Sequence, residues 1–241
     1  MKKYLIALSI AAGLSPLLAA QPSQAQAVGL TYWGIQLEEF EYRFGDEGED
    51  LAAWDGDAYF GTDEFKFRLM SEGEYDANAG KFETLENRLV GQVPISDFFD
   101  AKAGIRLDTP KGQNRWYGIV GVAGLAPQWF EVDADLFLSD QGDLSARLDV
   151  EYELLITNRL ILTPSAEINL AFSDDTEIEI KSGFTSLELG LRLSYDLIDR
   201  AFSPYVGLAF ETKLGDTEDL ISDEGEDTSA WFGVVGAKFV F

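Results

Sequence analysis

The stretch LSARLDVEYE, residues 144–153, alternates apolar and polar side chains without a break. Successive side chains of a strand point to opposite faces, so this alternation gives the stretch one apolar and one polar face. The apolar face carries Leu144, Ala146, Leu148, Val150 and Tyr152. A one-sided strand of about ten residues is typical of a transmembrane barrel wall, because strands of soluble sheets usually have about five or six. The pattern therefore predicts a membrane-spanning strand.

Similar alternation recurs along most of the chain. Turn residues separate twelve segments, at residues 32–44, 51–61, 64–75, 81–93, 98–108, 115–125, 129–139, 144–156, 159–172, 185–196, 202–213 and 228–241. The first two are the least regular, since Glu38-Glu39 breaks one alternation and Asp55-Gly56-Asp57 interrupts the other. An even strand number is the rule for bacterial single-chain barrels. The expected fold is all-β, an antiparallel transmembrane β-barrel of about 12 strands.

The connections between these segments alternate in length. Short ones hold residues 61–63, 94–97, 126–128, 157–158 and 198–200. Longer ones hold residues 45–50, 76–80, 109–114, 139–143, 173–184 and 214–227. Outer-membrane barrels have short periplasmic turns and longer extracellular loops. The short connections and both ends of the chain are therefore predicted to face the periplasm.

The N-terminal stretch has the features of a secretory signal peptide. Met1–Lys3 is basic, residues 4–20 are apolar but broken by Gly13 and Pro16, and small residues precede Ala27. A membrane anchor is the alternative, but the apolar run is shorter than the ~20 residues that a spanning helix needs. We expect cleavage after Ala27, which gives a signal peptide at 1–27 and an outer-membrane barrel at 28–241.

The last strand places Trp231, Val235, Phe239 and Phe241 on one face and ends in an aromatic residue. This ending is similar to the signal by which the barrel-assembly machinery recognises outer-membrane proteins. An ordinary final strand that happens to end in Phe is the alternative. The expected surroundings are outer-membrane lipid and lipopolysaccharide, with the barrel a monomer in a Gram-negative outer membrane.

Composition excludes several classes of function. The 241 residues include 18 Lys and Arg, 43 Asp and Glu, and neither His nor Cys, for a net charge of −25. Imidazole-based triads, zinc sites with nitrogen or sulfur ligands, and disulfides are therefore excluded, and the charge argues against nucleic-acid binding. Barrel hydrolases rely on a His base, so we expect no enzyme activity. The acid pair Asp133 and Asp135 alone does not indicate an enzyme.

The polar faces of the predicted strands are densely charged. Their bases are Lys66, Arg68, Arg88, Lys102, Arg106, Arg147 and Arg192, and their acids are Glu72, Glu74, Glu86, Asp100, Glu131, Asp133, Asp135, Asp149, Glu151, Glu153, Glu167 and Glu188. Charges inside a narrow barrel must be paired or hydrated. The sequence leaves two interpretations open. One is a network of ion pairs that fills the lumen, and the other is a cation path or binding site.

Two regions resemble the copper resistance protein B family of outer-membrane proteins. They are AWDGDAYFGTDE at residues 53–64 with SEGEYD at 71–76, and the run from Ala126 to Asp175. The resemblance extends from about residue 32 to 241. It implies a barrel that acts in copper resistance and copper homeostasis, by binding copper or limiting its passage, with a periplasmic copper oxidase or carrier as a partner. The alternative is a small cation-preferring pore or structural barrel without a copper role.

This chain departs from the family in its copper ligands. The family typically carries a Met- and His-rich segment before the barrel, whereas here only Val28–Thr31 separates Ala27 from the first strand. Copper(I) prefers sulfur ligands, and copper(II) prefers imidazole with carboxylate. Met70 with Glu72 and Glu86 is the candidate metal site, with Met70 expected roughly opposite Leu85 or Glu86. The alternative is a Met70 that only fills space in the lumen.

The segment 214–227 invites a second metal hypothesis. It contains seven acids, Asp216, Glu218, Asp219, Asp223, Glu224, Glu226 and Asp227. Clustered carboxylates suit Ca²⁺ or Mg²⁺, but the spacing does not match that of a twelve-residue calcium loop. A solvated, self-repelling loop is the preferred interpretation.

Overall fold

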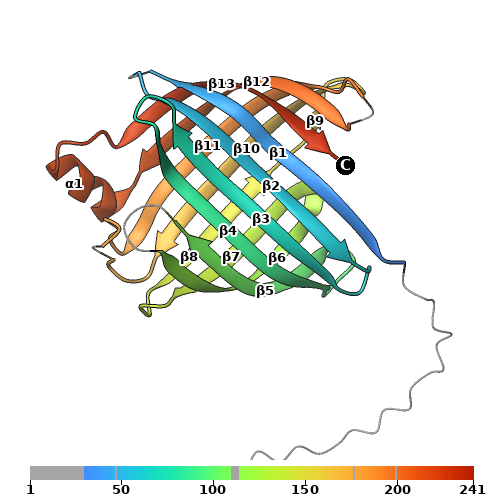
Figure 1. The fold of residues 1–241 in the computed structure, drawn as a ribbon, viewed down its shortest axis with the longest axis horizontal. Coiled ribbons are helices and arrows are strands. Elements are labelled where there is room, and N and C mark those ends of the chain that lie inside the picture. The colour runs from blue at the N-terminus through green and yellow to red at the C-terminus, as the bar shows by residue number, and fades with distance from the viewer. Residues whose placement is uncertain (1–29, 47, 110–113, 176, 199) are drawn as a thin grey trace, which may run out of the picture.

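The computed structural model describes residues 30–46, 48–109, 114–175, 177–198 and 200–241, and these form a closed barrel (Figure 1). The strands are β1 (Tyr32–Gly45), β2 (Asp50–Gly61), β3 (Lys66–Asp76), β4 (Lys81–Pro94), β5 (Phe99–Asp108), β6 (Arg115–Ala126), β7 (Phe130–Ser139), β8 (Leu144–Glu151), β9 (Leu154–Leu155), β10 (Leu160–Ala171), β11 (Gly183–Tyr195), β12 (Phe202–Lys213) and β13 (Ser229–Val240). The expected signal peptide lies outside the described residues.

Antiparallel pairing continues around the whole wall. Sequence neighbours pair throughout, and β13 pairs with β1 to close the barrel. The segments β8 and β9 both pair with β10, so they are two parts of one interrupted strand. The wall therefore has twelve strands, which confirms the predicted barrel. Within the described parts of the chain, no helix is long and apolar enough to span a bilayer.

The observed faces of β3 show why these sequences form a membrane wall. Phe67 and Leu69 are more than half exposed on the outside, whereas Arg68 and Met70, between and after them, lie on the inner face. Lipid solvates the outer side chains, and ion pairs or water solvate the inner ones. Every backbone group of a closed wall finds a partner in the neighbouring strand. The period of two therefore places apolar side chains in lipid and charged side chains in the lumen along the same strand.

The two ends of the barrel differ. The short connections lie at the end that also holds the chain's C-terminus, and helix α1 (Gly215–Asp223) lies at the opposite end (Figure 1). At the first end, a 3-10 helix, η1 (Pro127–Trp129), joins β6 to β7. The preferred interpretation of segment 214–227 as a solvated loop is wrong in conformation, because nine of its residues are helical, although all seven of its acids are exposed. Asp216 and Glu218 in the first turn stabilise that helix by complementing its N-terminal dipole.

Three long connections are joined into a cap at the α1 end. The hydroxyl of Thr217 in α1 accepts a hydrogen bond of 3.0 Å from the Lys181 backbone N–H, and Thr217 is buried. Arg115, at the start of β6, forms ion pairs with Asp175 and Glu177 in the β10–β11 connection. Ser173 donates to Asp143 in the β7–β8 connection. These contacts hold the helix beside the mouth of the lumen.

One contact of this cap is expected to depend on pH. Asp174 accepts hydrogen bonds from the Ser182 backbone N–H at 2.9 Å and from Lys181 Nζ at 3.0 Å, and these bonds lower the pKa of its carboxyl. A lowered folded-state pKa stabilises the fold above the unfolded-state pKa, and this stabilisation is lost as the pH falls through the folded value. The protection factor of the Ser182 amide, which corrects the exchange rate for its intrinsic fall with pH, should therefore decrease on acidification. In Asp174→Asn, which cannot titrate, protection that still falls with acid would contradict this origin.

A bulge in β1 resolves the broken alternation at Glu38-Glu39. In the pairing with β2, Leu37 lies opposite Gly56 and Glu39 lies opposite Asp55, so Glu38 has no opposite residue. Both Glu38 and Glu39 consequently line the lumen. Before the bulge the outward residues are odd-numbered, as with Ile35, and after it they are even-numbered, as with Phe40. The extra residue thus gives one strand two consecutive inward carboxylates.

Candidate functional site

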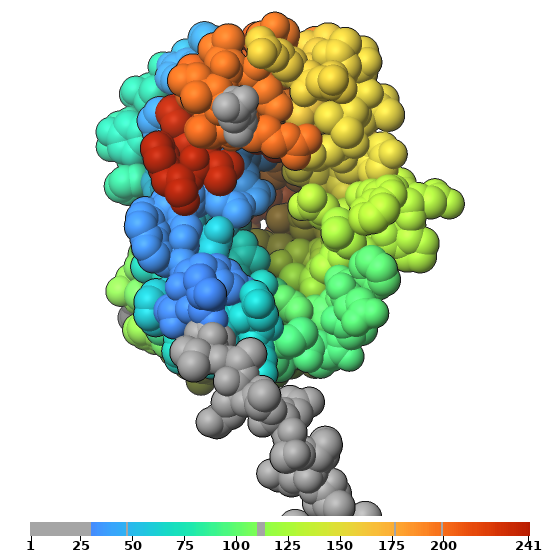
Figure 2. All heavy atoms as spheres, turned by 90° about the vertical axis from the view of Figure 1, so that its right-hand side faces the viewer, coloured from blue at the N-terminus to red at the C-terminus, as the bar shows by residue number. Residues whose placement is uncertain are grey.

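The lumen contains two cavities that meet at a thin layer of side chains. A cavity of about 590 Å³ lies toward the short-connection end, where Figure 2 shows a hollow at the centre of the barrel. A second cavity, of about 400 Å³, lies toward α1. Five residues line both cavities, and we call them the septum: Glu72, Glu74, Arg147, Glu167 and Glu188. The septum therefore lies where the two halves of the lumen meet.

Strand register arranges the lumen acids in two rows. Residues directly opposite each other on neighbouring strands form a first ladder on β1–β5, which consists of Glu39, Asp55, Glu72, Glu86 and Asp108. A second ladder on β7, β8, β10, β11 and β12 consists of Asp133, Asp149, Glu167, Glu188 and Glu211. Strands β6 and β13 contain no acid and divide the ladders. Like charges opposite each other repel, so each ladder needs counter-charges.

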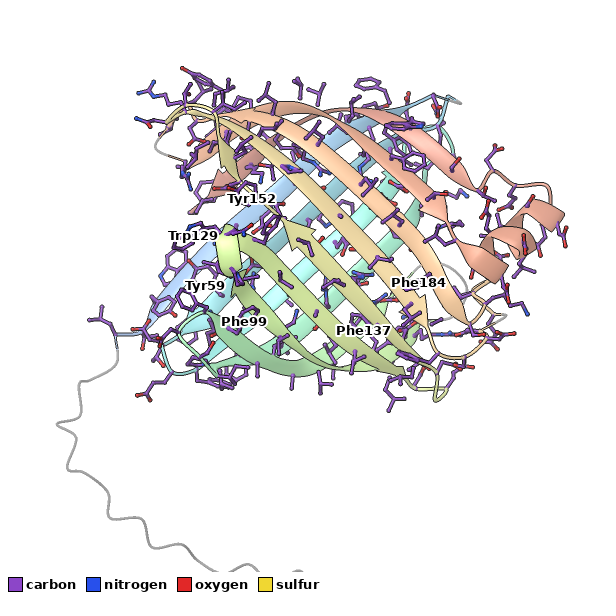
Figure 3. All side chains as sticks on the ribbon, turned by 180° about the vertical axis from the view of Figure 1, so that it is seen from behind. Tyr59, Phe99, Trp129, Phe137, Tyr152 and Phe184 are labelled. Carbon is purple, nitrogen blue, oxygen red and sulfur yellow. The ribbon has the colours of Figure 1, made fainter. Side chains whose placement is uncertain are left out.

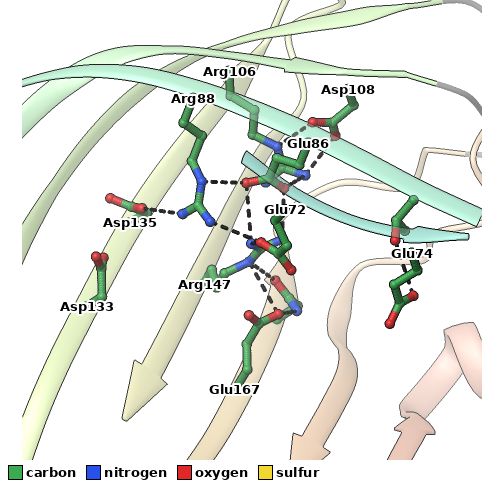
Figure 4. A network of polar contacts seen from close by, with 12 residues as sticks. Glu72, Glu74, Glu86, Arg88, Arg106, Asp108, Asp133, Asp135, Arg147 and Glu167 are labelled. Carbon is green, nitrogen blue, oxygen red and sulfur yellow. Dashed lines mark hydrogen bonds and ion pairs between the residues drawn. The ribbon is translucent and has the colours of Figure 1, made fainter. Parts of the chain in front are cut away.

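Arg147 connects the two ladders across the lumen. From β8 it reaches Glu72 at 3.3 Å and Glu86 at 3.1 Å, both in the first ladder, and Glu167 of the second ladder at 3.3 Å (Figure 4). In the twelve-strand wall, β3 lies five positions and β4 four positions from β8, so both strands are across the lumen from it. A planar guanidinium presents five N–H donors, which allows one side chain to bind several carboxylates. Arg147 therefore spans the lumen at the level of the septum.

Arg43 makes a second connection between the ladders. Its guanidinium lies 3.4 Å from Glu39 of the first ladder, and 3.2 Å from Glu188 and 2.6 Å from Glu211 of the second. It also contacts Glu74 of the septum at 2.8 Å. Arg43 is only 4% exposed. A charge buried to this extent requires several partners, and these carboxylates provide them.

Glu41 is the buried centre of this second group. Its carboxylate accepts hydrogen bonds from Arg43 Nε at 2.7 Å, from Arg192 Nε at 2.9 Å and from the Tyr205 hydroxyl at 2.8 Å. The Glu41 side chain has no exposed surface. One carboxylate thus holds two arginines that reach it from β1 and β11.

An apolar cluster lies in the lumen beside the network. Val90, Tyr117, Ile119 and Phe137 are buried together, and Met70 packs against them. The Arg106 guanidinium carbon lies 4.6 Å from the centroid of the Phe137 ring and 4.9 Å from that of Tyr117. Aromatic rings attract guanidinium groups in this arrangement. The cluster therefore helps to hold the arginines in place.

The three predicted metal-site residues lie on neighbouring strands, but they do not form a suitable copper site. Met70 lies opposite Arg88 and not opposite Leu85 or Glu86, because the pairing already begins at Asp76 and Lys81 and a bulge between Glu74 and Tyr75 adds one more residue of shift. Glu72 and Glu86 do lie opposite each other. However, Glu86 is already paired with Arg88 at 2.8 Å, Arg106 at 2.7 Å and Arg147 at 3.1 Å.

A cation at this position would meet three guanidinium groups, and its only soft ligand would be the Met70 sulfur. The residues present therefore do not fit a bound copper ion here. Among the described residues, no group of three or more acids is arranged to hold a metal. The Met70–Glu72–Glu86 site stays a prediction that this geometry does not favour.

The alternation found most of the lumen charges but missed others on β1, β2, β5 and β12. The missed residues include Glu38, Glu39, Glu41, Arg43, Asp55, Asp57, Asp108 and Glu211. The irregular starts of the first two strands hid most of them. One signal was available, since Glu41 and Arg43 alternate with Phe40, Tyr42 and Phe44. That short run indicates two inward charges.

Known proteins with similar sequences show the family of this chain. A family model described as "Copper resistance protein B precursor" matches residues 31–241. The chain belongs to the copper resistance protein B family. Copper resistance protein B of Escherichia coli is 35% identical over 207 residues, which cover 86% of this chain and 69% of the relative. A copper resistance protein B homolog of Pseudomonas syringae pv. tomato is 34% identical over 204 residues, covering 85% and 68%.

Membership of the copper resistance protein B family supports a role in copper resistance and confirms the predicted resemblance. Among solved structures, the NanC porin matches with a TM-score of 0.52 at 11% identity, over 86% of this chain and 99% of that one. That likeness concerns the fold alone. Family and fold together indicate an outer-membrane protein.

Proposed function

We propose that this protein contributes to copper resistance by limiting the passage of copper cations through the barrel. The septum supports this proposal most directly, because its side chains border both of the described cavities. Arg147 fixes that layer through carboxylates on both sides of the lumen. A positive group held in the path opposes the entry of another cation. In this proposal the barrel is a barrier to copper and not a tight copper site.

The larger cavity supports a second part of the proposal, the concentration of cations before the barrier. Its lining includes 14 acidic residues and six basic ones. A cleft lined by one sign of charge raises the local concentration of counter-ions. We expect this cavity to face the periplasm, since it lies at the short-connection end. Copper ions would be held there loosely. A periplasmic oxidase or carrier with soft ligands would then be the partner that removes them.

The test is the copper dose response of a strain that lacks the protein, with detergent sensitivity as a control for general envelope damage. We expect lower copper tolerance in this strain and restoration by the wild-type gene. Met70→Leu should also restore tolerance, because leucine fills the same space against Val90 and Phe137 without a sulfur atom. Cell-associated copper, measured at equal external copper, should rise in the strain without the protein.

Two results would contradict parts of this proposal. An unchanged dose response in a strain with no second copy of the gene would remove the copper role. Restoration by the wild type but not by Met70→Leu, at equal protein levels, would place the thioether in copper binding. In that case the Met70 site would replace the barrier as the mechanism.

A further inference from the structure

We propose that the lumen is a cation-selective pathway that Arg147 and Arg43 hold closed. The activity inferred is conduction of small hydrated cations, which release of the Arg147 bridge alone should already raise. This inference rests on the proposed function, because it assigns the barrier to two particular side chains. It goes further in stating that the rest of the pathway is already present.

The first step of the argument is the continuity of the lumen. Both cavities contact the same five septum residues, so they lie next to each other along the lumen. The remaining space of about 590 Å³ and about 400 Å³ has room for several water molecules or hydrated ions. Figure 3 shows the side chains of all strands, and the labelled Phe137 lies on β7 in the wall. Removal of the bridging side chains would therefore join two existing cavities.

The second step is the charge pattern along this path. Cross-strand partners lie about 5 Å apart, so each ladder offers a series of closely spaced carboxylates. Conduction requires sites that attract an ion but release it again. Within the described residues no three acids converge on one metal position, which agrees with weak, repeated sites. The ladders therefore favour the movement of cations over their tight retention.

The third step concerns how the bridges close the path. Arg147 and Arg43 each place a guanidinium between the two ladders, which is the position that a permeating cation would occupy. A tethered cation neutralises the carboxylates and cannot diffuse away. It acts as a permanently bound counter-ion. Replacing it with a neutral side chain should free both the space and the acids.

The test is the conductance of purified protein in planar bilayers under a salt gradient. Wild type is expected to be nearly silent. Arg147→Gln should raise conductance by about tenfold or more, with a reversal potential that shows preference for K⁺ over Cl⁻. The double variant Arg147→Gln/Glu167→Gln keeps the net charge of the septum unchanged and should also conduct. It provides a test if the single variant does not fold.

Arg106→Gln is the matched control. Arg106 also pairs with Glu86, at 2.7 Å, but its other ionic partner is Asp108, so it contacts the first ladder alone. This variant should stay as silent as the wild type. Circular dichroism of each variant would verify that the barrel is folded.

The outcomes separate this inference from the proposed function. Folded Arg147 variants that stay silent would overturn the gate and leave the barrier intact. Open variants that prefer Cl⁻ would overturn the role of the ladders. A wild type that already conducts strongly would overturn both the closed state and the proposed barrier. Loss of copper tolerance in cells that express the open, cation-selective Arg147→Gln would support both together.

Discussion

Glu41→Ala is expected to lower the free energy of unfolding by about 3–5 kcal/mol, because it leaves buried arginines without their shared partner. Glu41 binds Arg43, Arg192 and Tyr205, and its side chain is fully enclosed. Removal of one member of a buried ion group leaves the other charges uncompensated. A urea titration of the barrel in vesicles, followed by tryptophan fluorescence, would measure the change as a lower midpoint at constant slope.

Glu211→Ala is the matched control for this experiment. Glu211 contacts the same Arg43, at 2.6 Å, but its side chain is 31% exposed. Its removal should cost about 1 kcal/mol or less, because water can replace an exposed partner. Equal losses for the two variants would show that burial does not determine the contribution of this network. Glu41→Gln, which keeps the shape but not the charge, should fall between them.

Phe137→Ala is expected to cause the second large loss, again about 3–5 kcal/mol. Phe137 is 1% exposed and lies at the centre of the lumen cluster with Val90, Tyr117 and Ile119. Its ring also faces the Arg106 guanidinium. The substitution removes both the buried area and the aromatic face, and it leaves a cavity in the lumen. The same urea titration would measure it.

The neighbouring Leu136 provides the control on the same strand. Leu136 points outward and is 44% exposed, so lipid can fill the space after Leu136→Ala. The loss there should be clearly smaller than at Phe137. Phe137→Leu, which keeps most of the apolar volume but lacks a ring, would isolate the contribution of the Arg106 contact. If Phe137→Ala and Leu136→Ala were equally mild, the lumen cluster would not stabilise the barrel.

The wall could be predicted from the sequence because lipid imposes a strict period of two. Residues 144–151 form β8 with the predicted faces, and the predicted segments correspond to the twelve wall strands. Two features were not predicted, because each depends on a local departure from the regular alternation. The bulge at Glu38 adds a residue that alternation cannot place, and the helix Gly215–Asp223 arises in a segment whose acids suggested only solvation.

The lumen was predictable in composition but not in its connections. Alternation assigns Arg147 and Glu167 to the inner face, yet it does not state which partner lies across the barrel. That depends on strand register and on the closure of β13 against β1. The pairing of Asp76 with Lys81 and the one-residue bulge beside Glu74 together place Met70 opposite Arg88, a register that alternation does not give. Contacts between strands that are far apart in the sequence can therefore be identified only from the structure.

The bulge in β1 also affects how this protein can tolerate changes in length. Deleting one residue from a regular wall strand would turn every later side chain of that strand to the opposite face. Glu38 is different, because Leu37 already points outward and Glu39 already points inward. Loss of Glu38 would leave a plain alternating strand with all other residues on their present sides. Evolution could therefore remove or restore one inward carboxylate here by a three-nucleotide deletion or insertion, without rebuilding the barrel.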